Sequence, residues 1–433
     1  MIATVVIVAV TFLLLTFSIL FLPAIRVGKV KLGTYWMVAL VGALALMAAG
    51  LVPLSDIWEG LTADSAINPL KILVLFFSMT MLSVFLDEVG FFRYLAGRAA
   101  KIAGKDQRAL FVVFYFLTAV LTVFTSNDVV ILTLTPFLCF FCKNAKIDPV
   151  PYLVSEFAAA NTWSMMFIIG NPTNIYLATS AGLDFIGYFR IMALPTFAAG
   201  VLEFALIWLL FRKKLKAPMS PQADEYKPES LVDLVVGLVH LGVCLVFLVL
   251  SGYLNIEMWL VSAICAASLL VSVSIIRIVT KRGCHYLTGT LKRLPYELIP
   301  FVLSMFVIVI ALNVRGVSAK IGEFLGEKSC VWTYGGASYL ASNLINNIPM
   351  SILFSSLPTA LSEVARTQAV FASVVGSNIG AFLTPIGALA GIMFTSLTER
   401  YQVEYGFKRF ICYGVMISVP TLAAALAVLF ILL

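Results

Sequence analysis

Charged residues are scarce in this sequence of 433 residues. Only 12% of the residues are charged, whereas 61% are hydrophobic, and the mean hydropathy is +1.03. A soluble globular domain carries about 25% charged residues, so the composition excludes that class and indicates an integral membrane protein in a lipid bilayer. The net charge of +7 does not require a nucleic-acid partner, because basic residues of membrane proteins collect in cytoplasmic loops.

The sequence also lacks the motifs of common enzyme classes. Its two histidines, His240 and His285, form no HExxH zinc motif, and neither a GxSxG elbow nor a GxxxxGK(S/T) phosphate loop occurs. The seven cysteines show no disulfide framework. The pair Cys139 and Cys142 lies in an apolar stretch, where two packing residues are the simpler interpretation. We therefore predict no enzyme activity, no cofactor and no metal site.

Long apolar stretches are abundant and predict ten complete membrane spans. A helix needs roughly 20 apolar residues to cross a bilayer. The most linker-like stretch, 212–230, divides the spans into two sets of five. The ten spans are 2–22, 34–52, 68–87, 151–181, 188–211, 231–250, 256–276, 297–314, 366–398 and 409–433.

Two further segments, 107–142 and 331–361, each consist of two short apolar arms joined by polar residues. In the first segment, the arms 111–124 and 129–142 flank the residues Thr125 to Asp128. Each arm is shorter than an ordinary crossing. Two full crossings remain the alternative, but we interpret both segments as re-entrant helical hairpins, the first entering from the cytoplasm and the second from outside.

The distribution of basic residues orients the chain. If both termini face outside, most of the 29 Lys and Arg residues lie in cytoplasmic segments, as the positive-inside rule requires. Five spans is an odd number, so the second half then starts on the opposite side from the first. The sequence thus predicts an all-α membrane protein with a first repeat over 1–211, a cytoplasmic linker over 212–230, and an inverted second repeat over 231–433.

Matching polar sequences support the repeat. FTSNDVVILTLTPF (124–137) corresponds to LINNIPMSILFSSL (344–357). Spans 151–181 and 366–398 are both interrupted by polar residues, including GNPTN in the first and GSNIG in the second, so we expect two broken helices. Inverted repeats with broken helices and a site at the membrane midplane are typical of secondary transporters.

The polar interruptions predict a binding site at the centre of the membrane. Irregular backbone is tolerated at that depth only where protein or a water-filled cavity satisfies it. Helix N-termini there favour a small inorganic anion or a neutral oxy-acid, and we expect Asn127 or Asp128 to cap one helix and Asn347 another. The predicted substrate-binding residues are Ser126, Asn127, Asn171, Thr173, Asn174, Asn346, Asn347, Ser377, Asn378 and Thr384.

Ion coupling is predicted at Asp128, Asn161 and Thr162. An acidic residue at membrane depth costs about 2.5–3.5 kcal/mol to insert, and so indicates a function by default. Glu203, in the span that follows, is the next candidate for a proton relay. The coupling ion is H+ or Na+, because Asn, Ser and Thr oxygens with freed carbonyls suit either Na+ or H3O+.

Five stretches carry a resemblance to a known family: FLDEVGFFRYLA (85–96), SNDVVILTLTPF (126–137), LKRLPYELIPFVLSMFVIVIAL (291–312), INNIPMSILFSSL (345–357) and GSNIGAFLTPIGALAGIMF (376–394). In order and spacing they resemble the arsenite permeases of the ArsB type. These belong to the ion transporter superfamily and are related to NhaD-type antiporters and divalent anion/sodium symporters.

The resemblance implies a scaffold domain and a mobile transport domain that carries the hairpins in an elevator mechanism. It also implies a homodimer in the plasma (inner) membrane that exports As(III) or Sb(III) using an ion gradient, sometimes with a separate ATPase subunit. Asn161 and Asn378 stand where arsenite permeases tend to carry Asp. This difference favours, as the alternative, a sodium-coupled carboxylate or divalent-anion symporter or a Na+/H+ antiporter.

Overall fold

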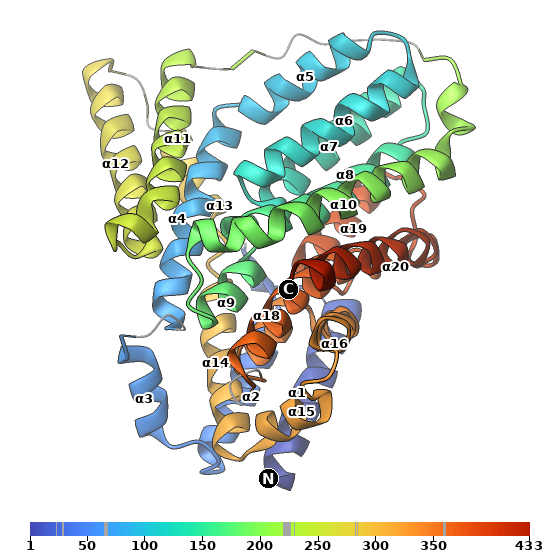
Figure 1. Cartoon of the computed structure of the whole chain (residues 1–433). Helices are drawn as coiled ribbons and strands as arrows, with labels where there is room; N and C mark the ends of the chain where they lie inside the picture. Colours follow the sequence, from blue (N-terminus) through green and yellow to red (C-terminus); the bar gives the residue numbers. More distant parts are fainter. Residues whose placement is uncertain are drawn as a thin grey trace.

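Helices account for nearly all of the structure, a computed structural model (Figure 1). Within the part of the chain that it describes, 9 helices are long and apolar enough to cross a membrane. Together with the apolar composition, these helices identify a multi-pass membrane protein. The described residues are 1–22, 24–27, 30–64, 68–219, 227–228, 230–281, 283, 285–357 and 361–433.

The described residues of the first half form ten α-helices, three short 3-10 turns and two antiparallel strands. The strands form a small hairpin in the predicted loop after the first span, which is a departure from the purely helical prediction. The elements are α1 (Ile2–Phe21), β1 (Ala24–Val27), β2 (Val30–Gly33), α2 (Tyr35–Ala48), α3 (Leu54–Thr62), α4 (Pro69–Glu88), α5 (Phe91–Ala103), α6 (Gln107–Phe124), α7 (Asn127–Ala145), α8 (Val150–Trp163), η1 (Ser164–Met166), η2 (Ile168–Gly170), α9 (Pro172–Ser180), α10 (Phe185–Phe211) and η3 (Lys214–Lys216).

The second half continues with helices alone among its described residues. They are α11 (Leu231–Leu254), α12 (Met258–Val279), α13 (His285–Arg293), α14 (Leu298–Val314), α15 (Val317–Leu325), α16 (Cys330–Ile345), α17 (Asn347–Ser356), α18 (Glu363–Gly380), α19 (Leu389–Arg400) and α20 (Phe407–Leu432).

The order of helices in the first half recurs in the second. The short helices α5 and α15 occupy equivalent places, each directly before a pair of helices joined by a tight turn. Gly90 and Gly316 precede them with φ of +89° and +68°, and Gly104 and Gly326 follow them with φ of +61° and +67°. Glycine adopts this left-handed conformation without strain. The recurrence supports the predicted repeat, and its inversion across the membrane stays a prediction.

Helices of the two halves pack against each other in a crossed manner. Helix α7 packs against α19, and α17 packs against α9. The last α-helices of the two halves, α10 and α20, lie side by side in the middle of Figure 1. Likewise α2 packs on α14, and α4 on α12. Helices of each half are therefore buried in part by helices of the other half.

The ten predicted spans correspond to helices within a few residues, and two of them are broken as expected. The breaks lie at 164–171, between α8 and α9, and at 381–388, between α18 and α19. The sequence GSNIG is not part of the second break, because α18 continues through it to Gly380. Residues 220–226 and 229 of the predicted linker, and 358–360 of the second predicted hairpin, lie outside the described residues.

The arms of the first predicted hairpin are longer than the sequence suggested. Helices α6 and α7 contain 18 and 19 residues, and both are long enough to cross a membrane. Helices α16 and α17 contain 16 and 10 residues. Re-entry of the first segment therefore stays a prediction, with two crossings as its alternative, whereas the second segment keeps the short arms expected of a hairpin.

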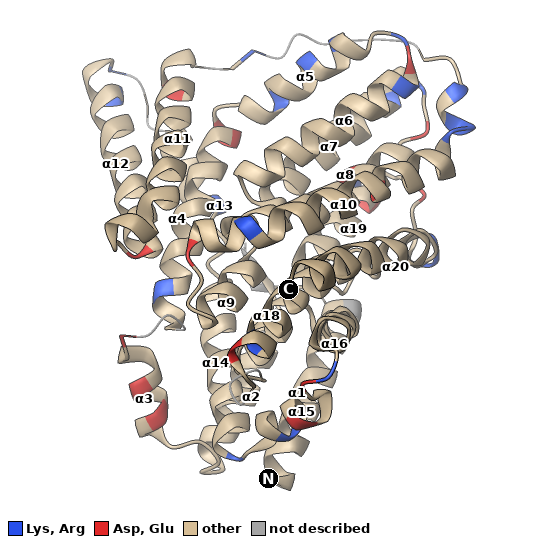
Figure 2. Ribbon diagram, viewed as in Figure 1, with Lys and Arg blue, Asp and Glu red and all other residues tan. Residues whose placement is uncertain are grey.

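Charged side chains lie mainly towards the ends of the helices. Figure 2 shows Lys and Arg along α5 at the top and acidic residues on α3 at the bottom. Arg277 on α12 forms an ion pair with Asp233 on α11. Arg293 on α13 lies 2.6 Å from Asp87 and 2.7 Å from Glu88 at the end of α4. These pairs join helices of the two halves or neighbouring helices, away from the two breaks.

Candidate binding site at the broken helices

The first break is closed by two asparagines, one at its last residue and one in the first turn of α9. The side chain of Asn171 accepts a hydrogen bond from the backbone N–H of Thr173 (3.2 Å), and Pro172 occupies the first position of α9, where no N–H is needed. Asn174 donates through its side-chain amide to the carbonyls of Ser164 (2.8 Å) and Phe167 (3.1 Å). The carbonyls freed by the break are thus satisfied by protein, as burial requires.

The second break is closed by the turn between α16 and α17. Asn343 donates to the carbonyl of Gly380 (3.0 Å), while its side-chain oxygen accepts from the hydroxyl (2.7 Å) and the N–H (3.1 Å) of Thr384. Asn346 donates to the carbonyl of Ile386 (2.9 Å), and the N–H of Asn347 donates to the carbonyl of Gly387 (3.0 Å). The tip of the second hairpin is therefore held against the break of its own half.

Asn378, near the end of α18, joins the two breaks. Its side-chain amide donates to the side-chain oxygen of Asn174 (2.7 Å), and its own oxygen accepts from the side-chain amide of Asn171 (2.9 Å). The hydroxyl of Ser164 lies 2.9 Å from the same oxygen of Asn378 and 2.7 Å from the carbonyl of Asn161. Because this hydroxyl has one hydrogen, it can serve one of the two acceptors at a time.

The tip between α6 and α7 contacts the end of α8. The side-chain amide of Asn127 donates to the side-chain oxygen of Asn161 (3.2 Å), and the side-chain N–H of Asn161 donates to the carbonyl of Phe157 (2.8 Å). The bond from Asn161 to a carbonyl fixes which of its atoms is the oxygen. The first tip, the first break and the second break therefore form one connected polar network.

Three buried oxygens at this network have no hydrogen-bond partner among the described residues. They are the side-chain oxygens of Ser126, Asn127 and Ser377, of which the last is fully buried. A buried polar atom without a partner costs about 1–3 kcal/mol, and native proteins rarely tolerate such atoms without a ligand, water or function. Each of these oxygens belongs to a residue of the network or to its direct neighbour in the chain, so their predicted role in substrate binding stays a prediction.

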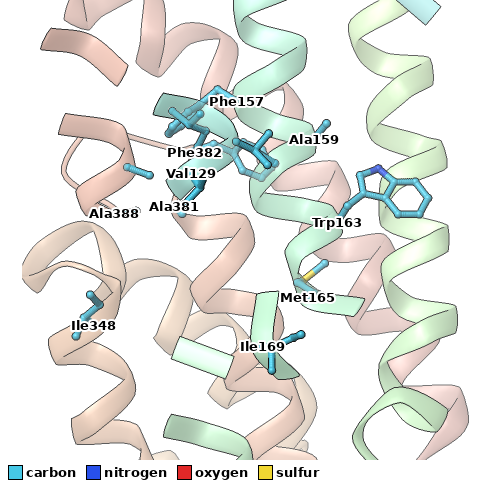
Figure 3. Packing of buried hydrophobic residues seen from close by; sticks show 14 of the residues in the cluster. Val129, Phe157, Ala159, Trp163, Met165, Ile169, Ile348, Ala381, Phe382 and Ala388 are labelled. Atoms are coloured by element: carbon cyan, nitrogen blue, oxygen red, sulfur yellow. The ribbon is translucent and has the colours of Figure 1, made fainter. Parts of the chain in front are cut away.

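Apolar residues enclose the network. Figure 3 shows Met165 and Ile169 at the first break and Ala381, Phe382 and Ala388 at the second. All five are buried. The polar groups therefore lie in surroundings of low dielectric constant, where each hydrogen bond and each charge has a larger effect than in water.

Helices α7, α9, α17 and α19 begin at the tips and breaks, and so direct the positive ends of their dipoles there.

The predicted caps are wrong in both hairpins. Helix α7 already begins at Asn127, after Ser126, and no side chain caps it. The amide of Asn127 is used for the bond to Asn161 instead. In the second hairpin the side chain of Asn346, rather than that of Asn347, accepts from the N–H of Ile348 (3.4 Å). The predicted caps lie one or two residues too late in the first hairpin and one residue too late in the second, because the tight turns contain fewer residues than expected.

Asp128 lies at the first tip with its side chain partly exposed, and no described residue forms a hydrogen bond or ion pair with it. It lies close enough to Tyr35, at the start of α2, to interact electrostatically with it. The carboxyl group is therefore not required by the local structure. The role of Asp128 in ion coupling stays a prediction.

Thr162, the other predicted ion-coupling residue, uses its hydroxyl within the protein. It donates to the carboxyl group of Glu203 on α10, which also lies 3.2 Å from the hydroxyl of Tyr115 on α6. Donating this hydrogen leaves the lone pairs of the Thr162 oxygen unused, so its predicted role in ion coupling stays a prediction. Trp163 donates to the same Tyr115 hydroxyl (3.2 Å), and in Figure 3 its ring extends towards the neighbouring helix, where Gly200 makes room for it.

Sequence reasoning missed Ser164, Asn343 and Tyr115. Ser164 and Asn343 lie within the polar runs that flagged the breaks, so their spacing offered a signal. Tyr115 offered none, because a tyrosine in an apolar helix is an ordinary packing residue. Glu156 on α8 was also missed; it is buried, and the hydroxyl of Thr135 on α7 lies 3.0 and 2.9 Å from its two oxygens.

Among the described residues, no group of three His, Cys, Asp or Glu could hold a metal ion.

Comparison with known proteins places the chain among membrane transporters. The family model described as Citrate transporter matches residues 26–376. The arsenical pump membrane protein of Escherichia coli is 25% identical over 416 residues, which cover 92% of this chain and 93% of that protein. An uncharacterized transporter of Mycobacterium tuberculosis is 26% identical over 411 residues, covering 90% of this chain and 91% of the relative.

A solved structure shares the fold. The crystal structure of the YdaH transporter of Alcanivorax borkumensis aligns with a TM-score of 0.55 at 15% sequence identity. The alignment covers 99% of this chain and 97% of that one. The likeness at this identity concerns the fold alone, and it extends over nearly the whole of both chains.

Proposed function

Because the chain belongs to the citrate transporter family, we propose that it is a secondary active transporter of the arsenite-permease type. It moves As(III) or Sb(III), or another small inorganic anion, across the plasma (inner) membrane. An ion gradient, of H+ or Na+, drives the transport. The name of the Escherichia coli relatives, arsenical pump membrane protein, supports this choice of substrate.

The observation that carries the proposal is the set of unpartnered oxygens in the asparagine network. Ser126 and Asn127 approach from the first hairpin, and Ser377 belongs to the second broken helix. All three groups are neutral, and no Lys or Arg forms a hydrogen bond with the described network. Neutral donors and acceptors suit an uncharged oxy-acid such as arsenious acid, whose hydroxyl groups both donate and accept hydrogen bonds.

A carboxylate or divalent-anion symporter coupled to Na+ is the second candidate. The description of the family as Citrate transporter favours it, as do Asn161 and Asn378 in places where arsenite permeases tend to carry Asp. A substrate with several negative charges is usually held by charge-assisted hydrogen bonds from Arg or Lys. The described network offers helix N-termini and amides for this task, but no basic side chain, and so it favours the less charged substrate.

In the proposed cycle, α6–α9 and α16–α19 form the mobile transport domain, and α1, α2, α4, α11, α12 and α14 belong to the scaffold. Two features support this division. The hydrogen bonds of the network join the tips and breaks to each other, and Arg366 at the start of α18 donates to the carbonyl of Ser180 at the end of α9 (2.6 Å). A homodimer, an outward orientation of both termini and an optional ATPase subunit complete the proposal.

Thermal stability of the purified protein tests the substrate. A ligand that binds only the folded state stabilises it by about 2.7 kcal/mol at 100 times its Kd. We expect As(III) to raise the melting temperature without Na+, and proteoliposomes to accumulate As(III) when a proton gradient is applied. Stabilisation by citrate or sulfate that requires Na+, without any effect of As(III), would instead establish the second candidate.

A further inference from the structure

Glu203 is a fully buried acid without a basic partner. Its carboxyl group contacts Thr162 of α8 and Tyr115 of α6, and Trp163 of α8 is bonded to the same Tyr115. Tyr115 is the titratable group in contact with it, and no charged side chain of the described residues on α6, α8, α11, α20 or the 3-10 turns interacts with it. A carboxylate in such a place would be a buried charge without a counter-charge, which is among the most costly arrangements in a protein.

The hydrogen atoms around Glu203 indicate its protonation state. The hydroxyl of Tyr115 has one hydrogen, and it lies 2.6 Å from the carbonyl of Gly200, which can only accept. That hydrogen is therefore used for Gly200. The Tyr115 oxygen then has two acceptor positions, of which one receives the indole N–H of Trp163 (3.2 Å). Its remaining contact, 3.2 Å to the carboxyl oxygen Oε1 of Glu203, is a hydrogen bond only if Glu203 supplies the hydrogen.

We infer that Glu203 is a proton-binding site of this transporter. It holds one proton on Oε1 and donates it to Tyr115, while Oε2 accepts the hydroxyl hydrogen of Thr162. On release, the proton passes to water and a carboxylate remains, which keeps the bond from Thr162 but has no donor in Tyr115. The inference deepens the proposed function, on which it rests, because it assigns H+ as a coupling ion.

A short path connects this proton to the first hairpin tip. Thr162 is bonded to Glu203 and directly follows Asn161 in the chain, and Asn161 is bonded to Asn127, which directly precedes Asp128. The path crosses three elements, from α10 through α8 to α7. A change of charge at Glu203 thus alters the bond that holds the end of α8, and through it the position of the tip.

Infrared difference spectroscopy of the purified protein tests for the proton directly. The spectrum of the wild type minus that of Glu203→Gln should contain the C=O stretching band of a protonated carboxyl group at neutral pH. Glutamine can replace both bonds, because its amide donates to Tyr115 and its oxygen accepts from Thr162, so the variant should fold. Absence of the band would show that Glu203 is ionised and would overturn the inference.

Two further variants serve as controls of the assignment. Tyr115→Phe removes the acceptor but keeps the acid, so the band should shift to a different frequency rather than disappear. Glu399→Gln removes an exposed carboxyl group at the end of α19, and its difference spectrum should lack the band. A band that is unaffected by Tyr115→Phe would contradict the proposed hydrogen bond.

Coupling to the tip is tested by thiol labelling. In a cysteine-free background that also carries Asp128→Asn, Ser126→Cys reports access to the tip, with rates normalised to the unfolded protein. We expect the rate to change between acidic and alkaline buffer by about 5- to 150-fold, the usual range of coupling between sites, and to become independent of pH with Glu203→Gln. A pH dependence that survives this substitution would overturn the coupling.

Neither experiment contains As(III) or any other substrate. Failure of As(III) to stabilise or to be transported would therefore overturn the substrate proposal while the infrared band and the labelling rates still report on Glu203. Conversely, transport of As(III) without the band would retain the proposed function and exclude this proton site.

Discussion

Asn378 uses both the donor and the acceptor of one side-chain amide to join two broken helices that lie about two hundred residues apart in the chain. The neighbouring Ser377 has an equally buried side chain whose hydroxyl has no described partner. We therefore expect these adjacent positions on one helix to differ in role: Asn378 supports the structure of the site, whereas Ser377 binds substrate. Residue type alone would not have separated the two.

The pair gives a matched test at the residue scale. Asn378→Ala leaves the amide of Asn171 and the oxygen of Asn174 without their partner, at about 1–3 kcal/mol each. We expect a loss of about 2–6 kcal/mol in stability, the sum of the two costs, measured as a lower midpoint of unfolding in detergent.

Ser377→Ala should leave that midpoint unchanged and weaken substrate binding by about 2- to 13-fold, the equivalent of one neutral hydrogen bond. The assignment would be wrong if Ser377→Ala were the more destabilising of the two substitutions, or if it left the affinity unchanged.

Asp128 gives a second prediction. Because no described residue is bonded to its carboxyl group, Asp128→Asn should retain the fold and much of the substrate binding. It should abolish accumulation against a gradient, while exchange of substrate down a gradient continues. Transport in proteoliposomes under applied H+ and Na+ gradients measures both. Uphill transport with unchanged dependence on pH and Na+ would exclude Asp128 as a coupling group.

Of all pairs of elements described, α16 and α18 share the most extensive contact, and small residues allow the two helices to approach each other. A Cβ atom on Gly376 would overlap the side chain of Ser338 and the backbone carbonyl of Gly335. Gly376 and Gly380 are four residues apart, the spacing of glycines that bring membrane helices together. Two glycines that were predicted to lie in a helix break thus belong to a close helix–helix contact.

Gly376→Ala should therefore destabilise the protein by about 1–3 kcal/mol, the usual cost of an overpacked interior. Gly336→Ala, on the facing helix α16, is the control, because a Cβ atom there would meet nothing within 4 Å. Alanine also favours a helix over glycine by about 1 kcal/mol, so this control should be neutral or stabilising. Midpoints of unfolding measure both, and equal shifts would exclude the close contact.

The sequence predicted the elements well and the contacts between them poorly. Spans follow from apolar length, and breaks follow from polar residues inside apolar runs, so both are local properties. The bond from Asn127 to Asn161 and the bond from Asn346 to the second break depend on which segments meet, which no single stretch determines. Likewise, the bond from Thr162 on α8 to Glu203 on α10 could not be predicted from either stretch alone.

For the whole molecule, the predicted inversion of the two halves can be tested on the exposed faces of α5 and α15. Arg98 on α5 and Lys320 on α15 both have exposed side chains. In a background without the seven native cysteines, Arg98→Cys should react with an impermeant thiol reagent from the cytoplasm, and Lys320→Cys from outside. Reaction of both from the same side would exclude the inverted arrangement.

The crossed packing of the two halves also has a consequence for synthesis. Helix α7 packs against α19, which leaves the ribosome roughly 250 residues later, or about 12–50 s at 5–20 residues per second. Throughout that interval the polar tip of the first hairpin has no permanent neighbour from the second half. Nascent chains stalled before α18 should therefore be the form most exposed to membrane proteases and most dependent on insertion factors, although every helix of their first half is already complete.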